Sequence, residues 1–200
     1  MRVHQAWGAL PWWNPRAQSH REASKRGGQG KKRHPTGKGS TYLYSLKPGD
    51  TVRFSGPFGD FALQPGNREK IFIGGGAGMA PLRAMVHALL DSDANERIHF
   101  WYGARNLREA PYVAEMAELA ERHPNFTWHL VLSEEAEHGA GLIKGLVHEA
   151  THDALLRDHP DIHSCEFYLC GPPAMLSATR QLLNKLGVDE AMVAYDDFKI

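Results

Sequence analysis

A run of glycines between an apolar segment and a proline could bind an anion through backbone amides. The run follows the apolar residues 71–73, precedes Pro81, and comprises Gly74, Gly75, Gly76 and Gly78. Glycine adopts positive φ and has no side chain, so another group can approach its backbone closely. Proline suits the first turn of a helix, where free N–H groups and the helix dipole attract phosphates. The spacing departs from G-x-G-x-x-G, so a phosphate-binding turn and a tight turn without ligand both remain open.

A second segment matches a zinc-binding pattern. His148, Glu149 and His152 form H-E-x-x-H, in which both histidines share one helix face and the glutamate activates a zinc-bound water. The longer metzincin pattern fails, because Leu155 stands where glycine is needed and Asp158 where histidine is needed. Twelve histidines in 200 residues also raise the number of chance matches. A zinc hydrolase is therefore kept as an alternative function.

The order of apolar segments predicts the elements that position these residues. Five apolar strands are expected at residues 70–74, 97–104, 126–133, 166–171 and 192–196. Four helical patterns connect them, at residues 80–91, 108–122, 144–156 and 173–186. This alternation predicts an α/β fold, an open five-stranded parallel sheet with helices on both faces. Ligands of such sheets bind outside the carboxyl ends of the strands, where the glycine run lies.

Charge is distributed unevenly along the chain. Residues 1–40 hold nine Lys or Arg and one acid, while the remaining residues hold fourteen Lys or Arg and twenty-two acids. A basic arm can bind nucleic acid or an anionic membrane, but this one has no aromatic residues within its basic cluster, as single-stranded nucleic acid would require. We therefore expect residues 1–35 to be a disordered, solvated segment and expect no nucleic-acid partner. Residues 51–56 alternate in polarity like a half-buried strand.

Apolar runs and cysteines restrict the cellular setting. No apolar run is long enough to cross a membrane. Two cysteines, Cys165 and Cys170, argue against a disulfide framework and fit a reducing compartment. Their spacing is not a metal signature, and a free thiol at the end of a strand is usually a small apolar residue.

Three segments at three strand ends resemble the NAD(P)-binding half of the ferredoxin–NADP reductase superfamily. They are "IGGGAGMAPLR", "WYGAR" and "YLCGPPAML". With "SLKPGDTVRFSGPFGDF" and the terminal "YDDF", the sequence is similar to the F subunit of sodium-translocating NADH:quinone reductases over residues 35–198. The resemblance implies residues 36–66 as a remnant of a flavin-binding β-barrel and residues 67–200 as an NAD-binding domain.

The resemblance also implies roles for individual residues. The four glycines of residues 74–78 would hold the NADH pyrophosphate, and Gly103 and Arg105 would lie beside the adenosine. Cys170, Gly171 and Pro172 would flank the nicotinamide, and Phe198 would cover a flavin ring. Ser40 and Thr41 match the family's flavin-pyrophosphate position, and Pro57 and Phe58 match the turn that closes its barrel. The acids Glu134 and Glu135, next to Ser133, would hydrogen-bond ribose and repel a 2′-phosphate, which favours NADH over NADPH; Arg105 argues the other way.

The sequence also departs from that family. It has no Arg-x-Tyr-Ser flavin segment, no four-cysteine 2Fe–2S ligand set and no N-terminal membrane helix. We therefore expect a part of the reductase, shortened on its N-terminal side, that binds NADH, while the complete enzyme passes hydride from NADH to FAD. The expected partners are NADH and other subunits of a membrane quinone reductase, at the cytoplasmic face of a bacterial inner membrane. A non-catalytic NADH-binding or interaction fragment is the other alternative, beside the zinc hydrolase.

Overall fold

The computed structural model describes residues 37–53, 55–56, 58–92, 95–134 and 142–196. The chain divides into two compact units: one ends at Asp60 and contains helix α1 (Lys38–Ser45), and the other holds the sheet from Phe61 onward. The predictions made for residues 1–35, Pro57, Glu135 and Phe198 fall outside the described residues.

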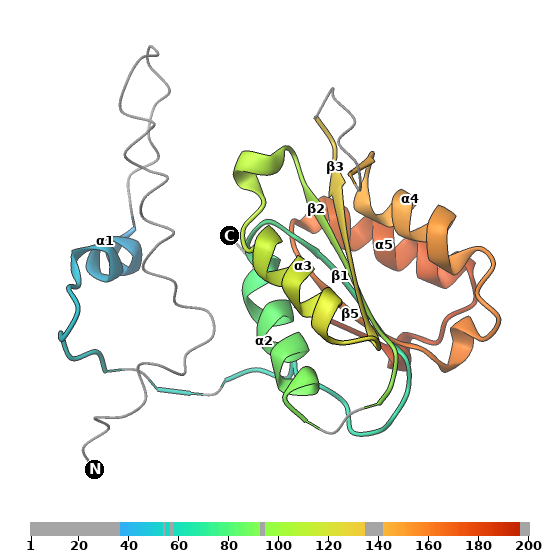
Figure 1. Cartoon of the computed structure of the whole chain (residues 1–200), viewed down its shortest axis with the longest axis horizontal. Helices are drawn as coiled ribbons and strands as arrows, with labels where there is room; N and C mark the ends of the chain where they lie inside the picture. The colour runs from blue at the N-terminus through green and yellow to red at the C-terminus, as the bar shows by residue number, and fades with distance from the viewer. Residues whose placement is uncertain (1–36, 54, 57, 93–94, 135–141, 197–200) are drawn as a thin grey trace. The chain divides into compact units, whose positions relative to one another are not determined.

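The second unit is built on one sheet of six parallel strands (Figure 1). The strands are β1 (Lys70–Gly75), β2 (Ile98–Ala104), β3 (Phe126–Leu132), β4 (Ile143–Lys144), β5 (Glu166–Cys170) and β6 (Val193–Asp196). Their order across the sheet is β4-β3-β2-β1-β5-β6, so β1 lies in the middle and the chain proceeds outward from it in both directions. The change of direction falls between β1 and β5, the place where such sheets bind ligands.

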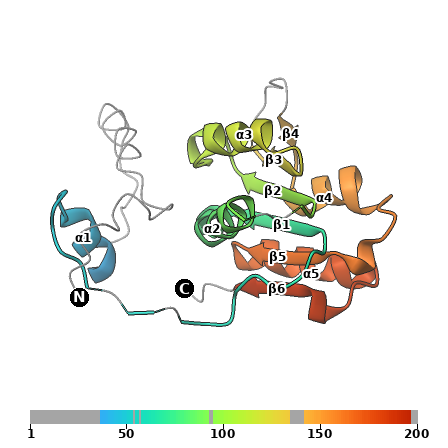
Figure 2. The same cartoon turned by 60° about the horizontal axis from the view of Figure 1, so that its bottom comes forward.

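Four helices of this unit cover the two faces of the sheet. They are α2 (Met79–Leu90), α3 (Val113–Arg122), α4 (Val147–Thr151), which continues as a π-helical turn over His152–Leu156, and α5 (Pro173–Lys185). Figures 1 and 2 show α2 and α3 on one face and α4 and α5 on the other. The prediction of a parallel α/β sheet with helices on both faces is thus confirmed.

Alternating strand residues build a separate core on each face. Phe72 stacks on Tyr168 with ring centroids 4.9 Å apart and meets Phe100 edge-on at 6.2 Å, beneath α2 and α3. The neighbours Ile71 and Ile73 point the other way, into the core beneath α4 and α5. This two-residue period follows from the pleat of a strand. Because both faces are covered, β1 and β5 are buried along their whole length and, after the charged residues Lys70 and Glu166, read as apolar runs.

The structure corrects the sequence analysis at three places. The sheet has six strands and not five, because β4 adds two residues beside Val131 and Leu132. No described residue of the range 51–56 is in a strand, so the strand predicted there is wrong. The helix predicted over residues 108–122 is a 3-10 turn, Leu107–Glu109, followed by α3, and Tyr112 separates them with a φ of 60°.

Candidate functional site

The glycine run forms the turn between β1 and α2. Gly74 and Gly75 end the strand, and Gly76–Gly78 make a 3-10 turn that leads directly into the helix. No side chain caps the first turn of α2, and no acidic residue lies in it. Gly76 and Ala77, in the 3-10 turn before the helix, are exposed, whereas Gly78 and Met79 are buried and the amide of Met79 already donates to the carbonyl oxygens of Gly76 and Ala77. Uncapped amides at a helix N-terminus are a binding site for an anion.

Close backbone contacts explain why Gly78 in this turn and Gly171, the residue after β5, are both glycine. A Cβ on Gly78 would lie 1.9 Å from the carbonyl oxygen of Cys170, so the turn after β1 packs directly on the end of β5. A Cβ on Gly171 would lie 3.0 Å from the carbonyl oxygen of Gly75. The two loops therefore contact each other through backbone, and no other residue type fits without a shift of the chain.

The remaining glycines serve the turn or the packing beneath it. Gly76 has a φ of +54°, a left-handed conformation that favours glycine. A Cβ on Gly74 would lie 2.8 Å from Cδ1 of Leu82, and one on Gly103 would lie 3.0 Å from Cβ of Val147. Gly74 and Gly103 thus let α2 and α4 approach the sheet, a packing role that the sequence alone did not separate from ligand binding.

Tyr102 is a residue of the site that the sequence analysis missed. Its hydroxyl donates a 2.8 Å hydrogen bond to the carbonyl oxygen of Gly76, across the boundary between β2 and the glycine turn. The ring is fully buried, and burial raises the pKa of the phenol to about 12, with the charge of Glu109 adding to the shift. Tyr102 therefore remains a hydrogen-bond donor and fixes the turn. In the sequence, the only indication of a role for Tyr102 was its position within the "WYGAR" segment.

Arg105 follows β2 and is already paired. Its Nε and Nη2 donate to the two carboxylate oxygens of Glu109, at 2.8 and 2.7 Å. These hydrogen bonds, with the charges of Glu109 and Glu134, raise the pKa of Arg105 above its ordinary value. Glu134 follows β3, and its amide donates to the carbonyl of Arg105 at 2.9 Å. The structure thus brings Arg105 and Glu134 together at the carboxyl edge, with Glu109 as a residue not foreseen.

Cys170 ends β5 with its side chain in the core beneath α2. The residue is fully buried, and burial, followed by the charge of Asp196, raises the pKa of its thiol to about 12. Gly171 and Pro172 come next and lead into α5, whose first turn begins at Pro173. The sulfur therefore stays protonated at neutral pH, and a nucleophilic thiolate is not available there.

Ser40, Thr41 and Phe58 lie in the other compact unit. Ser40 and Thr41 are inside α1, and Phe58 is 83% exposed. In the described part of residues 37–69 no strand forms before β1, so the wall of a flavin-binding barrel is not found among these residues. They do not fit a flavin site as described, and we derive no chemical step through FAD in this chain.

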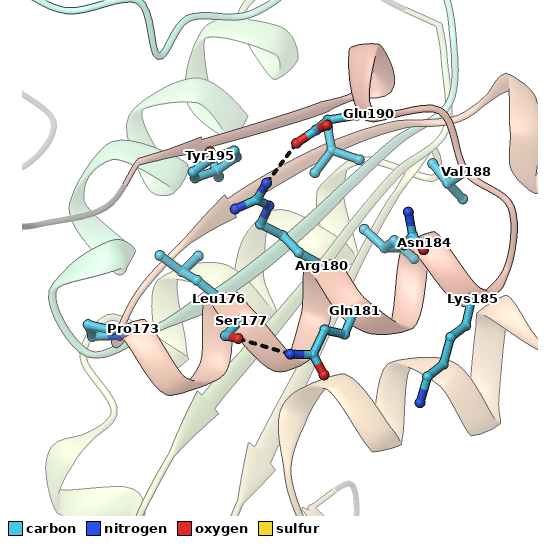
Figure 3. A pocket seen from close by; sticks show the side chains of 12 residues that line it. Pro173, Leu176, Ser177, Arg180, Gln181, Asn184, Lys185, Val188, Glu190 and Tyr195 are labelled. Carbon is cyan, nitrogen blue, oxygen red and sulfur yellow. Dashed lines mark hydrogen bonds and ion pairs between the residues drawn. The ribbon is translucent and has the colours of Figure 1, made fainter.

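A groove with a volume of about 570 Å³ lies between α5 and β6, and Figure 3 shows the side chains that line it. Its lining runs along α5 from Pro173 to Lys185, and Tyr195 of β6 lies across from Arg180. Arg180 donates to Glu190 at 2.7 Å and its guanidinium lies 4.1 Å from the centre of the Tyr195 ring. The groove does not include the glycine turn, and the uncapped helix end and close backbone contacts are the better guide to a dinucleotide site.

The H-E-x-x-H segment lies elsewhere, on α4 and the turn that continues it. His152 contacts Asp153 at 2.9 Å through Nδ1. Among the described residues, the one group of three metal-ligating side chains within bonding reach of one ion does not include His148, Glu149 or His152. The zinc-hydrolase alternative thus lacks a third ligand in the described part of the chain.

A parallel sheet with a glycine turn at the place where the strand order reverses is typical of a dinucleotide-binding domain. Residues 72–181 match the family described as the oxidoreductase NAD-binding domain, and the chain belongs to that family. More narrowly, the resemblance to the F subunit of the sodium-translocating NADH:quinone reductase is confirmed. The chain is 46% identical over 166 residues to the protein of that name in Methylococcus capsulatus and 43% identical over 171 residues to the one in Marinomonas sp.. The alignments cover 82% and 84% of this chain, but the chain spans only 41% and 42% of those relatives.

Solved structures agree with this assignment. A cytochrome P450 reductase of Amycolatopsis is similar with a TM-score of 0.63 and 28% identity, over 72% of this chain and 42% of that one. The FAD/NAD-binding domain of a nitric oxide dioxygenase from Vibrio cholerae is similar with a TM-score of 0.68 and 26% identity, over 80% of this chain and 63% of that one. The ferredoxin reductase in carbazole 1,9a-dioxygenase is similar with a TM-score of 0.64 and 27% identity, over 83% of this chain and 48% of that one. None of the helices that the structure describes has the length and apolarity of a membrane span.

Proposed function

We propose that this chain binds NADH at the turn between β1 and α2, as the hydride-donor half of a flavin-dependent NADH:quinone oxidoreductase. The observation that carries the proposal is the uncapped N-terminus of α2, whose turn packs by backbone against the end of β5. Amides held in this way can hydrogen-bond a diphosphate without a cationic side chain. The nicotinamide would then lie toward Cys170 and Gly171, the residues in contact with the turn.

The pairing of Arg105 supports NADH over NADPH as the ligand. A 2′-phosphate requires a cation that is free to bind it bidentately. The Nε and Nη2 donors of Arg105 are already hydrogen-bonded to the carboxylate of Glu109, and Glu134 adds negative charge nearby. The carboxylates can accept hydrogen bonds from ribose hydroxyls, whereas a phosphate dianion would be repelled.

Hydride transfer requires position rather than a protein nucleophile. When a flavin is bound in the complete enzyme, it supplies the hydride acceptor. The residues of this chain would orient the dinucleotide: the glycine turn holds the pyrophosphate, and the buried neutral thiol of Cys170 offers an uncharged surface beside the ring. Other subunits of a membrane quinone reductase are the proposed partners. Flavin contacts by Ser40, Thr41 and Phe198 stay a prediction from the resemblance alone, because the described residues before β1 form no barrel wall.

Calorimetric titration of the purified chain with NADH, NADPH and FAD tests the proposal. We expect NADH to bind at micromolar concentration and NADPH at least about tenfold more weakly, which corresponds to about 1.4 kcal/mol. Gly76→Ala should weaken NADH binding, because alanine is strained at the left-handed φ of this turn. Gly187→Ala is the matched control, since Gly187 has a φ of +77° at the distant end of α5. Equal affinities for NADH in both variants would contradict the site.

A second candidate function is a non-catalytic NADH-binding module. It is favoured by the lack of strands in the described residues before β1. The flavin titration separates the two: FAD binding with bleaching of its visible absorbance by NADH supports the reductase, and NADH binding without FAD binding supports the module.

A further inference from the structure

A cluster of histidine, cysteine and glutamate lies at the opposite edge of the sheet, where the strands begin. The parallel register pairs Lys70 of β1 with Glu166 of β5. The residues just before this pair, Glu69 and Cys165, are therefore brought side by side, and the amide of Glu166 donates to the carbonyl of Glu69 at 2.9 Å. His159 approaches them from the loop after α4. The segment before β1 and the segment between α4 and β5 thus place a carboxylate, an imidazole and a thiol close together.

The ligand atoms lie at distances suited to one tetrahedral ion. Nε2 of His159 is 3.3 Å from Oε1 of Glu69 and 3.9 Å from Sγ of Cys165. The potential ligand atoms of all three residues lie within 4.8 Å of one another. Bond lengths of about 2.0–2.3 Å at tetrahedral angles separate N, O and S ligands of zinc by about 3.3–3.6 Å. The separation of His159 from Glu69 matches this range, and that from Cys165 exceeds it by a few tenths of an ångström. Because Sγ also lies 4.0 Å from Nδ1, the His159 ring must turn for Nε2 to face the ion.

Neighbouring groups already orient the glutamate. His99 Nε2 lies 2.7 Å from Oε1 of Glu69, and Arg97 forms a 2.7 Å ion pair with Oε2. Thr127 in turn contacts Nδ1 of His99 at 2.8 Å, which fixes the ring. A carboxylate held by such hydrogen-bonding partners is typical of a metal ligand.

We propose that Glu69, His159 and Cys165 form a binding site for a zinc-like divalent cation, separate from the dinucleotide edge. Thiolate, imidazole and carboxylate together select a borderline-soft ion such as Zn²⁺ over Mg²⁺ or Ca²⁺. The ion replaces the thiol proton of Cys165, which leaves to solvent, and forms bonds to sulfur, nitrogen and oxygen. A water completes the tetrahedron.

The site has a structural consequence and costs two hydrogen bonds. Coordination removes the thiol proton of Cys165, which donates to the carbonyl oxygen of Asp161 at 3.5 Å. An ion there would tie the loop before β5 to the start of β1, next to the buried Lys70, which pairs with Glu96 at 3.2 Å and with Glu166 at 3.3 Å. The backbone N–H of Asp161 donates to Nδ1 of His159 at 3.2 Å. A metal on Nε2 places the ring proton on Nδ1, so this contact must open. His99 acts only as a positioning residue, through Glu69.

The test is titration of the tag-free full chain with Co²⁺, followed by absorbance. Coordination by Cys165 produces a thiolate-to-cobalt charge-transfer band and the intense visible bands of a tetrahedral ion, at one ion per chain. Added Zn²⁺ should abolish both sets of bands. Binding at His148 and His152 would give no thiolate band, so the readout separates the two places. If no thiolate band appears in the wild-type chain, the proposal is wrong.

Matched variants assign the ligands. Cys165→Ser and His159→Gln should remove the thiolate band or weaken cobalt binding more than 100-fold, while Cys170→Ser and His163→Gln should leave it unchanged. His99→Gln should weaken binding about 10–100-fold, as loss of an orienting partner does. Glu69→Gln provides a further ligand variant should Cys165→Ser fail to fold by circular dichroism. A band that persists in Cys165→Ser, or is lost equally in His163→Gln, would overturn the assignment.

Discussion

Adding one methyl group at Gly78 should destabilise the protein more than the same change at Gly76. The Cβ of Gly78→Ala would lie 1.9 Å from the carbonyl oxygen of Cys170, whereas contacts under 3.0 Å are essentially never seen. The turn and the end of β5 must therefore separate by about 1 Å, which breaks the packing of two buried loops and should cost about 3 kcal/mol. At Gly76 the nearest atom to a Cβ is 3.9 Å away, so only the positive φ is strained. That strain, less the entropy lost by the unfolded chain, should cost about 1 kcal/mol.

Urea unfolding followed by tryptophan fluorescence measures this difference, since Trp101 and Trp128 lie in or against the two cores. With a slope of about 2 kcal/mol per molar urea, the midpoint should fall by about 1.5 M for Gly78→Ala and about 0.5 M for Gly76→Ala. Gly39→Ala, with nothing within 4 Å, should leave the midpoint of the sheet unit unchanged. Equal midpoints for the Gly78 and Gly76 variants would refute the backbone contact on which the site depends.

Three further results are expected. Glu109→Gln should release Arg105 and raise the affinity for NADPH while changing that for NADH little, which paired calorimetric titrations would measure; an unchanged NADPH affinity would show that Arg105 does not reach the 2′ position. Tyr102→Phe should cost about 1 kcal/mol in urea unfolding and weaken NADH binding, because it removes the buried donor to Gly76; normal NADH affinity in that variant would separate the turn from the ligand. Both thiols should resist alkylation in the native state, and stability should fall as pH rises from the ordinary thiol pKa of 9.0 toward about 12, because the native state keeps a thiol proton of Cys170 that the unfolded chain loses. Stability that rises over this pH range would contradict the burial of the thiol.

Much of the sheet could be predicted because its strands are buried on both faces. Residues 71–73 and 167–170 read as continuous apolar runs, and the glycines that follow mark where the strands end. β4 could not be predicted, because Ile143 and Lys144 are too few to show a period and pair only through Val131 and Leu132. The range 51–56 misled for the opposite reason: its alternation suits a strand, but the described residues have no partner strand to pair with.

The site was foreseen less completely, because its decisive contacts join residues far apart in the chain. The hydrogen bond from Tyr102 to Gly76 and the approach of Gly78 to Cys170 both depend on the strand register. The pairing of Arg105 with Glu109 depends on a 3-10 turn that was expected to be part of a helix. Cys165 was considered only together with Cys170, whose spacing is not a metal signature, and only the parallel pairing of β1 with β5 places Cys165 beside Glu69.

The outermost strands of the sheet are also its shortest, with two residues in β4 and four in β6. An edge strand exposes a row of unpaired peptide groups that can recruit the edge of another molecule. Because β4 and β6 are so short, they expose few unpaired peptide groups for such association, although the central strands are strongly apolar. We therefore expect the folded chain to resist aggregation, and expect fibril-forming tendency to appear only when the central strands are exposed by unfolding.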